Sequence, residues 1–545
     1  MIIRFNSNLW NNFESEMNFQ IFLKSKTWAP VVIAAVFFTP IEFHTSSLFF
    51  RPAYSAIPMQ QQEAAAARCT TYDPTIRLIA IECGTVTLPA IHKALNDPSI
   101  LYEESNGFWV LNSNLRIGRN ATLYINSTDT KWLKINSSSP EIAYGLQILG
   151  NANIDSVRIS SWNYSSNNYA QNRPDGKVPR AYIRVGPNGT GTTHITNSEL
   201  SYLGSSFDHR SQGLTYLSGD GNVLRNNTIH HMWYGFYSEE IGNMVIEDNN
   251  VYDNIKYGLD PHTGTHDMLI RNNRVHDNGH IGIICSVDCK NITIDSNQVS
   301  NNAGTGIMMS INMQHSIVTN NIVSNENSGV EISESRNNGV YKNIVKNSGE
   351  GIEIHNASSS NNVHDNLVAN SSTCGIQIND NNSSENTIGA NYVINSTTKG
   401  ICIFGGASEN TVSHNTVSST SIYAIYVKDP NTVGNLFKDN TLFNTSAATI
   451  RLIDNSKSVF ISNPIYNSAK DEYSLADGST LTLLNTTFSS DIIKSTNGTN
   501  SVTISNVDKR PIKNDRNIAN IINSTSVTLS FRLAAGEHIT LTTLS

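Results

Sequence analysis

Charged side chains are scarce in this chain of 545 residues: they make up 15% of it, and the formal net charge is −8. Nucleic-acid binding depends on clustered Lys and Arg against phosphates, and the sequence contains no basic stripe. We therefore exclude a nucleic-acid partner. A polyanionic sugar is not excluded, because it needs only a local basic group within a binding site.

No apolar run reaches the roughly 20 residues that a membrane-spanning helix needs. The apolar stretch from Trp28 to Phe43 is interrupted by two prolines, follows Lys24 and Lys26, and precedes small residues near Ala56. This order is typical of a secretory signal. We predict that residues 1–56 are a signal peptide or an N-terminal membrane anchor. The protein is then secreted or at the cell surface, with membrane contact only through that anchor.

Cysteine is also rare, and six residues in an exported chain permit disulfides. We expect Cys69 to pair with Cys83. Cys285 and Cys289 are four residues apart but have no second such pair and no close His partner, so no metal site is predicted. Sequons typical of an exposed glycoprotein are frequent: they begin at Asn120, Asn126, Asn136, Asn163, Asn188, Asn291 and Asn395, among others.

What the sequence does have is a repeat, marked by paired asparagines. An Asn, in several coils the second of an Asn pair, recurs every 22–25 residues: Asn227, Asn250, Asn273, Asn297, Asn321, Asn343, Asn366, Asn391, Asn415 and Asn440. A constant period of this length is the signature of a solenoid. Asn suits left-handed corners between strands, and stacked Asn side chains can form hydrogen-bonded ladders. The repeat predicts an all-β fold, a right-handed parallel β-helix of 22–25-residue coils.

A short strand follows a small residue in each repeat, and its side chains alternate in character. The first and third positions after the glycine are mostly apolar, so we expect them to point into the core. The second position faces outward and reads Tyr237, Asp260, Ile284, Met308, Glu331, Glu353 and Gln377. The fourth position reads Glu239, His262, Ser286, Ser310, Ser333, His355 and Asn379. Such a face can line a groove for an extended polymer, or it can be an ordinary solvated sheet surface.

The regular repeats define a predicted domain organisation. Residues 57–105 are an N-terminal cap that contains a helix over Leu88–Leu95, because the open end of a solenoid must be covered. Residues 106–455 form the parallel β-helix and carry the catalytic residues. Residues 456–545, where the repeat fades, are late β coils or a small β module.

One coil breaks the pattern of its neighbours. It reads Tyr257-Gly258-Leu259-Asp260-Pro261-His262 and places a proline inside a strand of a parallel sheet. Local rules that are broken in one coil of a regular array often mark function. Alternation puts Asp260 and His262 on the outward face, about 4.8 Å from Tyr237 and Glu239 in the preceding coil.

This hexapeptide resembles the Tyr-Gly-Phe-Asp-Pro-His signature of mannuronan C5-epimerases, which modify alginate and fold as right-handed parallel β-helices. The resemblance extends over the repeats, roughly residues 107–455. It implies that His262 is the base, Tyr257 an acid or base, and Asp260 a site organiser. The next residue is Asp in the periplasmic members and Thr263 here, and the calcium-binding repeat modules of the secreted members are missing. No cofactor therefore follows from the sequence, and the use of calcium stays open.

Epimerisation removes a proton next to a carboxylate and returns one to the opposite face, so it needs a base, an acid and a group that neutralises the carboxylate. We expect Glu239 to raise the pKa of His262 and to select its tautomer. The predicted substrate-binding residues are Tyr237, Glu239, Arg225 and Lys290. Arg225, Arg271, Lys256 and Lys290 are candidates for the neutralising cation. Arg225, Asp248, Arg271 and Asp295 also fit a structural ion ladder along the solenoid.

The expected partner is an anionic polysaccharide, a uronan, bound by a monomer. Three other functions stay open at this point. A polysaccharide lyase begins with the same proton abstraction. A glycoside hydrolase needs two carboxylic acids, for which Asp260 and Glu239 are the available pair. A non-catalytic cell-surface carbohydrate-binding protein would use the groove without chemistry.

Overall fold

The structure of the chain is a computed structural model, and it describes residues 59–139, 141–207, 211–466, 472–485, 492–505, 512–514, 517–519 and 528–541. These residues all belong to the second of two units, residues 57–545. The predicted targeting segment, residues 1–56, lies outside the described residues. Among the described residues, no helix has the length and apolar character that a membrane crossing requires.

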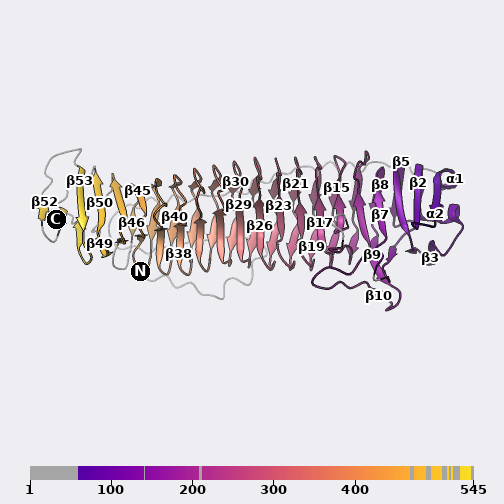
Figure 1. The fold of residues 1–545 in the computed structure, drawn as a ribbon, viewed down its shortest axis with the longest axis horizontal. Coiled ribbons are helices and arrows are strands. Elements are labelled where there is room, and N and C mark those ends of the chain that lie inside the picture. The colour runs from indigo at the N-terminus through magenta and orange to yellow at the C-terminus, as the bar shows by residue number, and fades with distance from the viewer. Residues whose placement is uncertain are drawn as a thin grey trace, which may run out of the picture. The chain divides into compact units, whose positions relative to one another are not determined.

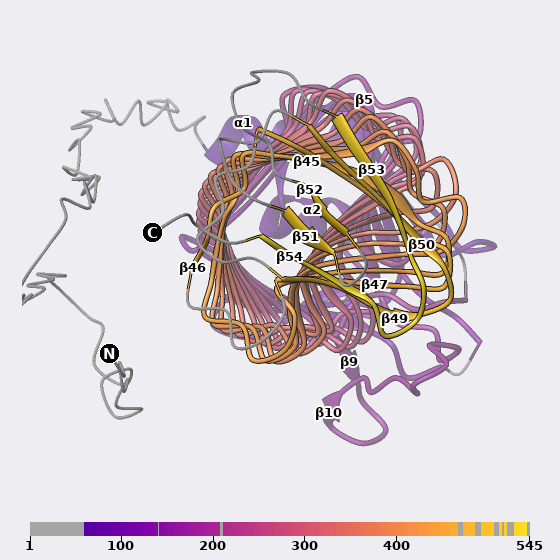
Figure 2. The same cartoon turned by 90° about the vertical axis from the view of Figure 1, so that its left-hand side faces the viewer.

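Short parallel strands stack coil upon coil into three sheets, here called the first, second and third faces (Figures 1 and 2). The strands of the first face are β7 (Gly145–Ile148), β11 (Tyr182–Val185), β14 (Gly213–Tyr216), β17 (Tyr234–Ser238), β20 (Leu259–Pro261), β23 (Ile283–Ser286), β26 (Thr305–Ser310), β29 (Ser328–Ser333), β32 (Glu350–His355), β35 (Cys374–Ile378), β38 (Lys399–Ile403), β41 (Tyr423–Lys428), β44 (Ile450–Ile453) and β47 (Tyr473–Ala476). The predicted parallel β-helix is confirmed by this pairing.

The second face follows the first in every coil. Its strands are β8 (Asn151–Asp155), β12 (Thr193–Thr196), β15 (Val223–Arg225), β18 (Val245–Glu247), β21 (Leu269–Arg271), β24 (Thr293–Asp295), β27 (Ile317–Thr319), β30 (Gly339–Tyr341), β33 (Asn362–His364), β36 (Thr387–Gly389), β39 (Thr411–Ser413), β42 (Asn435–Lys438), β45 (Lys457–Ile461), β48 (Thr480–Leu484) and β50 (Asn500–Ser505).

The third face completes each coil. Its strands are β4 (Phe108–Leu111), β6 (Trp132–Asn136), β9 (Arg158–Asn163), β13 (Glu199–Ser201), β16 (Thr228–His230), β19 (Asn250–Tyr252), β22 (Arg274–His276), β25 (Gln298–Ser300), β28 (Ile322–Ser324), β31 (Ile344–Lys346), β34 (Leu367–Ala369), β37 (Tyr392–Ile394), β40 (Thr416–Ser418), β43 (Thr441–Phe443) and β46 (Ile465–Tyr466). A two-residue strand, β10 (Asn168–Tyr169), adds to β9 in antiparallel fashion.

The core runs along the inside of the coils, where the alternation of the sequence predicts it. The first apolar position after each glycine is fully buried throughout the regular repeats: Phe236, Leu259, Ile283, Ile307, Val330, Ile352, Ile376 and Ile401. The small residue before it is required by a close approach. A Cβ added at Gly258 would lie 2.6 Å from the Gly282 carbonyl oxygen and 2.6 Å from Val275 Cγ1.

A buried asparagine ladder joins successive coils, as the repeat predicts, but its members differ from the prediction in one coil. Each ladder Asn donates its side-chain amide to the side-chain oxygen of the next, and the coil after Asn227 supplies Asn249 rather than Asn250. The left-handed residue is the one directly before the ladder Asn, for example Asp248 and Asn272. In several coils an Asn occupies the left-handed corner, as expected, and the following Asn points its side chain inward to stack.

Loss of one ladder amide is expected to destabilise the solenoid. Asn321 is fully buried, donates to Asn343, Ile294 and Thr319, and accepts from Asn297. We expect Asn321→Ala to lower the free energy of unfolding by about 3 kcal/mol, because several buried groups lose their partners.

The exposed Asn325 is the matched control for this change. Its side chain donates to the Asn301 side chain and accepts from the Asn347 side chain, both at the surface. We expect Asn325→Ala to change the stability by less than about 0.5 kcal/mol. Urea denaturation midpoints of the two variants measure both effects, and equal midpoints would contradict a structural role for the buried ladder.

The N-terminal end of the solenoid is covered by α1 (Met59–Cys69) and α2 (Leu88–Leu95) (Figure 2). The helix predicted over Leu88–Leu95 is α2, and the predicted disulfide between Cys69 and Cys83 is present. The elements around these helices are β1 (Thr70–Asp73), β2 (Leu78–Thr87), β3 (Leu101–Ser105) and the long β5 (Asn114–Asn126), which pairs with both β7 and β8.

The coils continue beyond residue 455, through β45, β48 and β50. Antiparallel strands then close this end: β49 (Ile492–Asn497) pairs with β54 (His538–Leu541), and β50 pairs with β53 (Thr528–Leu533). Two further strands, β51 (Ile512–Asn514) and β52 (Asn517–Ala519), form an antiparallel pair. The described residues after 455 thus include further coils followed by antiparallel strands.

Candidate active site

The coil with the unusual motif lies on the first face, where β20 stacks on β17. Tyr237 is opposite Asp260, and Ser238 is opposite Pro261, as predicted from the repeat. One extra residue in β17, before Tyr237, shifts the register between β14 and β17. Such irregularities are frequent next to active sites because they redirect side chains.

Aromatic rings surround this point of the first face. The rings of Tyr234 and Tyr257 have centroids 4.9 Å apart, and Tyr237 lies 5.9 Å from Tyr234 and 5.4 Å from His262. His280 from the following coil adds a ring 5.5 Å from Tyr257. The structure therefore brings together the predicted residues Tyr237, Tyr257 and His262.

Asp260 lies beneath these rings and is 1% exposed. Its Oδ1 is buried without a hydrogen-bond partner among the described residues. Burial without a compensating cation raises the pKa of Asp260 well above its ordinary value. The alternation predicted that Asp260 faces outward in register with Tyr237, and the pairing agrees. The alternation did not indicate that the carboxyl is buried there.

His262 is half-buried, and its Nδ1 lies 2.7 Å from the Thr263 hydroxyl. Burial of the imidazole lowers the pKa of His262, and the Glu239 carboxylate offsets this only in part. The Glu239 charge thus acts on the pKa of His262 in the predicted direction, but burial has the larger effect. Glu239 accepts a hydrogen bond of 2.7 Å from the Tyr237 hydroxyl, so a tyrosine takes the contact expected for the histidine.

The tyrosine hydroxyls stay protonated. Burial, followed by the nearby Asp260 carboxyl, raises the pKa of Tyr234 and of Tyr257. Burial and the hydrogen bond to Glu239 raise the pKa of Tyr237. At neutral pH the cluster then holds a neutral imidazole beside protonated phenols and a carboxyl whose pKa is raised well above its ordinary value. Environments that separate pKa values in this way provide one group to accept a proton and another to donate one.

Two of the candidate cations lie elsewhere. Arg225 and Arg271 are on the second face, and both pair with the buried Glu247, with an Arg271 Nε to Glu247 Oε2 distance of 2.6 Å. The alternative of an ion ladder is thus the arrangement found. Its carboxylate is Glu247 rather than Asp248, which takes the left-handed corner.

The two lysines differ in their relation to the cluster. Lys290 is exposed in the turn after β23, where its backbone bridges to His266. Lys256 is half-buried beside the cluster: its ammonium lies 5.9 Å from the Trp233 ring centroid, and its charge helps to lower the pKa of His280 after burial. Of the four candidate cations, Lys256 is the one at the rim of the aromatic cluster.

Sequence reasoning missed Tyr234 and the role of Thr263. Tyr234 directly precedes Gly235 as Tyr257 precedes Gly258, so alignment of the two coils could have identified it. Thr263 was noted only as a departure from the periplasmic pattern. Its contact with His262 needs the folded geometry.

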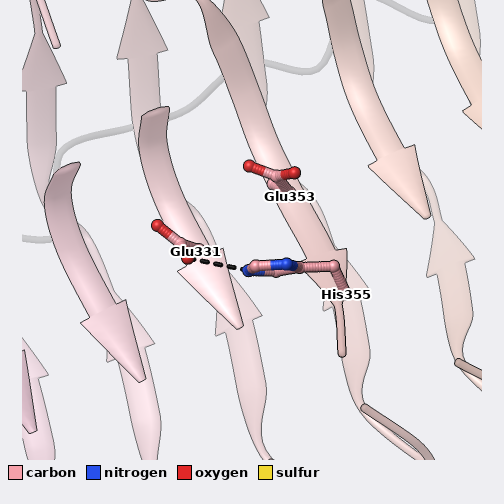
Figure 3. Close-up of side chains that lie close together, drawn as sticks. All are labelled: Glu331, Glu353 and His355. Atoms are coloured by element: carbon pink, nitrogen blue, oxygen red, sulfur yellow. Dashed lines mark hydrogen bonds and ion pairs between the residues drawn. The ribbon is translucent and has the colours of Figure 1, made fainter. Parts of the chain in front are cut away.

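A second cluster lies on the same face, on β29 and β32 (Figure 3). Glu331, Glu353 and His355 offer ligand atoms within 4.8 Å of one another. His355 Nε2 lies 2.7 Å from Glu331 Oε1. Burial lowers the pKa of His355, but this hydrogen bond and the surrounding carboxylate charges together outweigh burial and raise it. Thr305 donates to Glu331 Oε2 at 2.6 Å, while Gln377 and Ser328 donate to Glu353. The donor set could hold a metal ion.

Two more disulfides support the first face. Cys285 and Cys289 are joined in the core of the coil after β20, and the Cys289 sulfur lies 3.8 Å from the Pro261 carbonyl oxygen. Cys374 and Cys402 connect β35 to β38. Disulfides persist in oxidising compartments.

Comparison with protein families gives one match. The profile described as a right handed beta helix region matches residues 143–310 and 262–417, which together cover half of the chain. The predicted handedness of the solenoid agrees with that description.

Comparison with individual proteins leads to one enzyme class. The mannuronan C5-epimerase of Pseudomonas fluorescens is 27% identical over 180 residues, 31% of this chain and 32% of the relative. That of Pseudomonas syringae pv. tomato is 26% identical over 202 residues, 35% of this chain and 36% of the relative. The chain therefore aligns with about a third of the length of these relatives.

Among solved structures, the periplasmic alginate epimerase AlgG is similar at a TM-score of 0.50 and 19% identity, over 72% of this chain and 84% of that one. A double mutant of AlgG gives a TM-score of 0.54 over the same shares. At this identity the likeness is one of fold.

Proposed function

The chain belongs to the right-handed β-helix family, and from this premise we propose that it is a C5-epimerase of uronic acid residues in a polysaccharide. A fold of this kind serves many functions, so the proposal rests on the site. The observation that carries it is the cluster on β17 and β20, where the His262 imidazole, the rings of Tyr237 and Tyr257 and the buried Asp260 carboxyl meet on one face. The relatives named mannuronan C5-epimerases make mannuronate the first substrate to test.

His262 is the proposed base. Its pKa lies below the ordinary value, so the imidazole is neutral at neutral pH and can accept the C5 proton. When Nδ1 carries its proton and donates to the Thr263 hydroxyl, Nε2 keeps a lone pair for this step. The function of Thr263 in this proposal is to hold that tautomer.

Tyr257 is the proposed acid. Its phenol remains protonated because burial and Asp260 raise its pKa. It returns a proton to the opposite face of C5, and exchange with solvent restores the two starting protonation states. Tyr237, whose hydroxyl donates a hydrogen bond to Glu239, lies beside His262 and is proposed to bind the sugar.

Asp260 is the proposed neutralising group. An ionised uronate makes its C5 proton very weakly acidic, so a proton donor or cation must neutralise the carboxylate. Burial raises the pKa of Asp260 well above its ordinary value, and its buried Oδ1 has no partner among the described residues. We propose that the bound uronate reaches this oxygen when substrate binding opens the position, and that Asp260 then shares a proton with it. Lys256 at the rim adds positive charge nearby. We assign no such role to Arg225 and Arg271, which neutralise Glu247.

Calcium enters the proposal only as a question for the triad in Figure 3. Ca²⁺ takes six to eight oxygen ligands in proteins. Glu331 and Glu353 supply carboxylates, but His355 supplies a nitrogen and occupies one Glu331 oxygen. This donor set does not fit calcium, and no step of the proposed reaction depends on it. We therefore expect activity to survive chelation with EDTA.

We further propose that the protein acts as a monomer outside the cytoplasm, secreted or at the cell surface. Three disulfides support an oxidising compartment. The substrate-binding set is proposed as Tyr237 and Glu239 with Lys256, while Lys290 and Arg225 lie outside the cluster that supports the proposal.

The direct test is proton NMR of polymannuronate incubated in D₂O with the purified protein, with and without calcium or EDTA. We expect new guluronate signals and deuterium at C5. Unsaturated chain ends would instead identify a lyase, which expels the C4 substituent after the same abstraction. No change across a panel of uronans, with polymer binding retained, would favour a carbohydrate-binding protein.

A further inference from the structure

The outward column that contains the candidate acid–base cluster continues along the whole first face. From Asp260 the positions in register are Ile284, Met308, Glu331, Glu353, Gln377, Cys402, Tyr426 and Arg451. The last of these lies eight coils from Asp260, or about 38 Å at the usual strand spacing. A polymer that follows the face would pass both points.

At that distance the column carries a cationic and aromatic cluster. The Lys399 ammonium lies 4.9 Å from the Tyr426 ring centroid, and the Tyr423 ring stacks on Tyr426 at 5.7 Å. Arg451 is opposite Tyr426 in the next coil and donates to the hydroxyls of Ser474 and Thr496. The side chains of Lys399, Tyr423, Tyr426 and Arg451 are partly exposed, so a ligand can reach the cluster.

The cations of this cluster lack carboxylate partners, in contrast to their neighbour Lys428. Lys428 lies 3.7 Å from Asp454 and 3.9 Å from Asp429. Neither Lys399 nor Arg451 has an ion-pair partner among the described residues. Burial and the charge of Lys428 lower the pKa of Lys399, which shows that its ammonium is partly desolvated and not neutralised by an acid. Two uncompensated cations beside an aromatic ring are complementary to an acidic sugar.

We propose that Lys399, Tyr426 and Arg451 form a second binding site for the polyuronate chain, six to eight coils from the cluster around His262. The proposal rests on the proposed function for its ligand class. In this arrangement the cations bind uronate carboxylates and the Tyr423–Tyr426 platform packs against a sugar ring. Simultaneous binding at both sites makes a long chain bind more tightly than a short one, because the second contact becomes intramolecular.

The test measures how affinity depends on chain length, by calorimetry in a His262→Ala background that prevents turnover. The ligands are polymannuronate and a mannuronate tetrasaccharide, which is too short to span eight coils. We expect the polymer to bind at least tenfold more tightly per chain than the tetrasaccharide. Adding Lys399→Ala and Arg451→Ala should abolish most of this difference. Gln substitutions at both positions serve as a second variant if the alanine form does not fold.

The matched control is Lys438→Ala. Lys438 ends β42 on the second face, in the same coil as Tyr426, and is paired with Asp439. The Lys438→Ala change removes one positive charge and leaves the first face unaltered. The dependence of affinity on chain length should therefore stay as in the His262→Ala protein. A neutral mannan polymer should show no such length dependence.

The outcomes separate this proposal from the proposed function. If the double variant keeps the full length dependence, or neutral mannan shows it too, the second site is overturned even when the wild-type protein epimerises. If the dependence is lost in the double variant but the wild-type protein shows no epimerisation, the binding site stands and the proposed chemistry falls.

Discussion

His262→Ala is expected to lower the rate of C5 epimerisation by about 100-fold to 10,000-fold, the usual contribution of a positioned general base. The imidazole is neutral at neutral pH, and Thr263 orients it. Among the residues that the structure describes, His262 is the one group with a lowered pKa whose ring contacts Tyr237. The measurement is deuterium incorporation at C5 of polymannuronate, followed by NMR.

His276→Ala is the matched control for this prediction. His276 lies on the third face, where it stacks on Tyr252 and contacts Asp277 and Asn250. The His276→Ala change removes the same type of ring from β22, on the third face of the coil that contains β20. The epimerisation rate should therefore stay within a factor of two of the wild type. Equal rates for His262→Ala and the wild-type protein would reject His262 as the base.

Asp260→Ala is expected to lower the rate by about 100-fold, while Asp260→Asn should keep much more of the activity. The reason is that the proposed function of Asp260 is to donate a hydrogen bond while uncharged, and an amide also donates. If Asp260 instead acted as an ionised group, the two variants would be equally impaired. Rates of deuterium incorporation at C5 distinguish these outcomes.

The stability of Asp260→Asn gives an independent check, because a raised pKa links folding to pH. The native protein holds the Asp260 proton at pH values where the unfolded chain has lost it. The stabilisation from this proton is complete below the unfolded pKa, near 3.9, and declines as the pH rises toward the folded value. We therefore expect Asp260→Asn to be more stable than the wild type at pH 8, with the difference vanishing near pH 4. Urea denaturation at both values measures this.

The period and the alternation of the sequence by themselves determined the architecture. An interval of 22–25 residues, with small residues before apolar–polar strands, allows only stacked coils with the first and third positions inside, and those positions are buried. The helix over Leu88–Leu95 and the Cys69–Cys83 pair also followed from local sequence. The hexapeptide around Asp260 stood out because its proline breaks a rule that every neighbouring coil obeys.

Only the tertiary structure decided which side chains meet. Asn249 replaces Asn250 in the ladder because the register between coils depends on corner geometry, which pairs of identical residues do not reveal. Glu239 contacts Tyr237 rather than His262, and Glu247 binds Arg225 and Arg271. Several partners are equally spaced along the sequence, and the length and direction of each side chain in the folded coils decide which of them it contacts. Asp260 is buried because rings from two coils cover it, and burial depends on the sum of all neighbours. The charge state of the site therefore comes from packing, which no single stretch of sequence encodes.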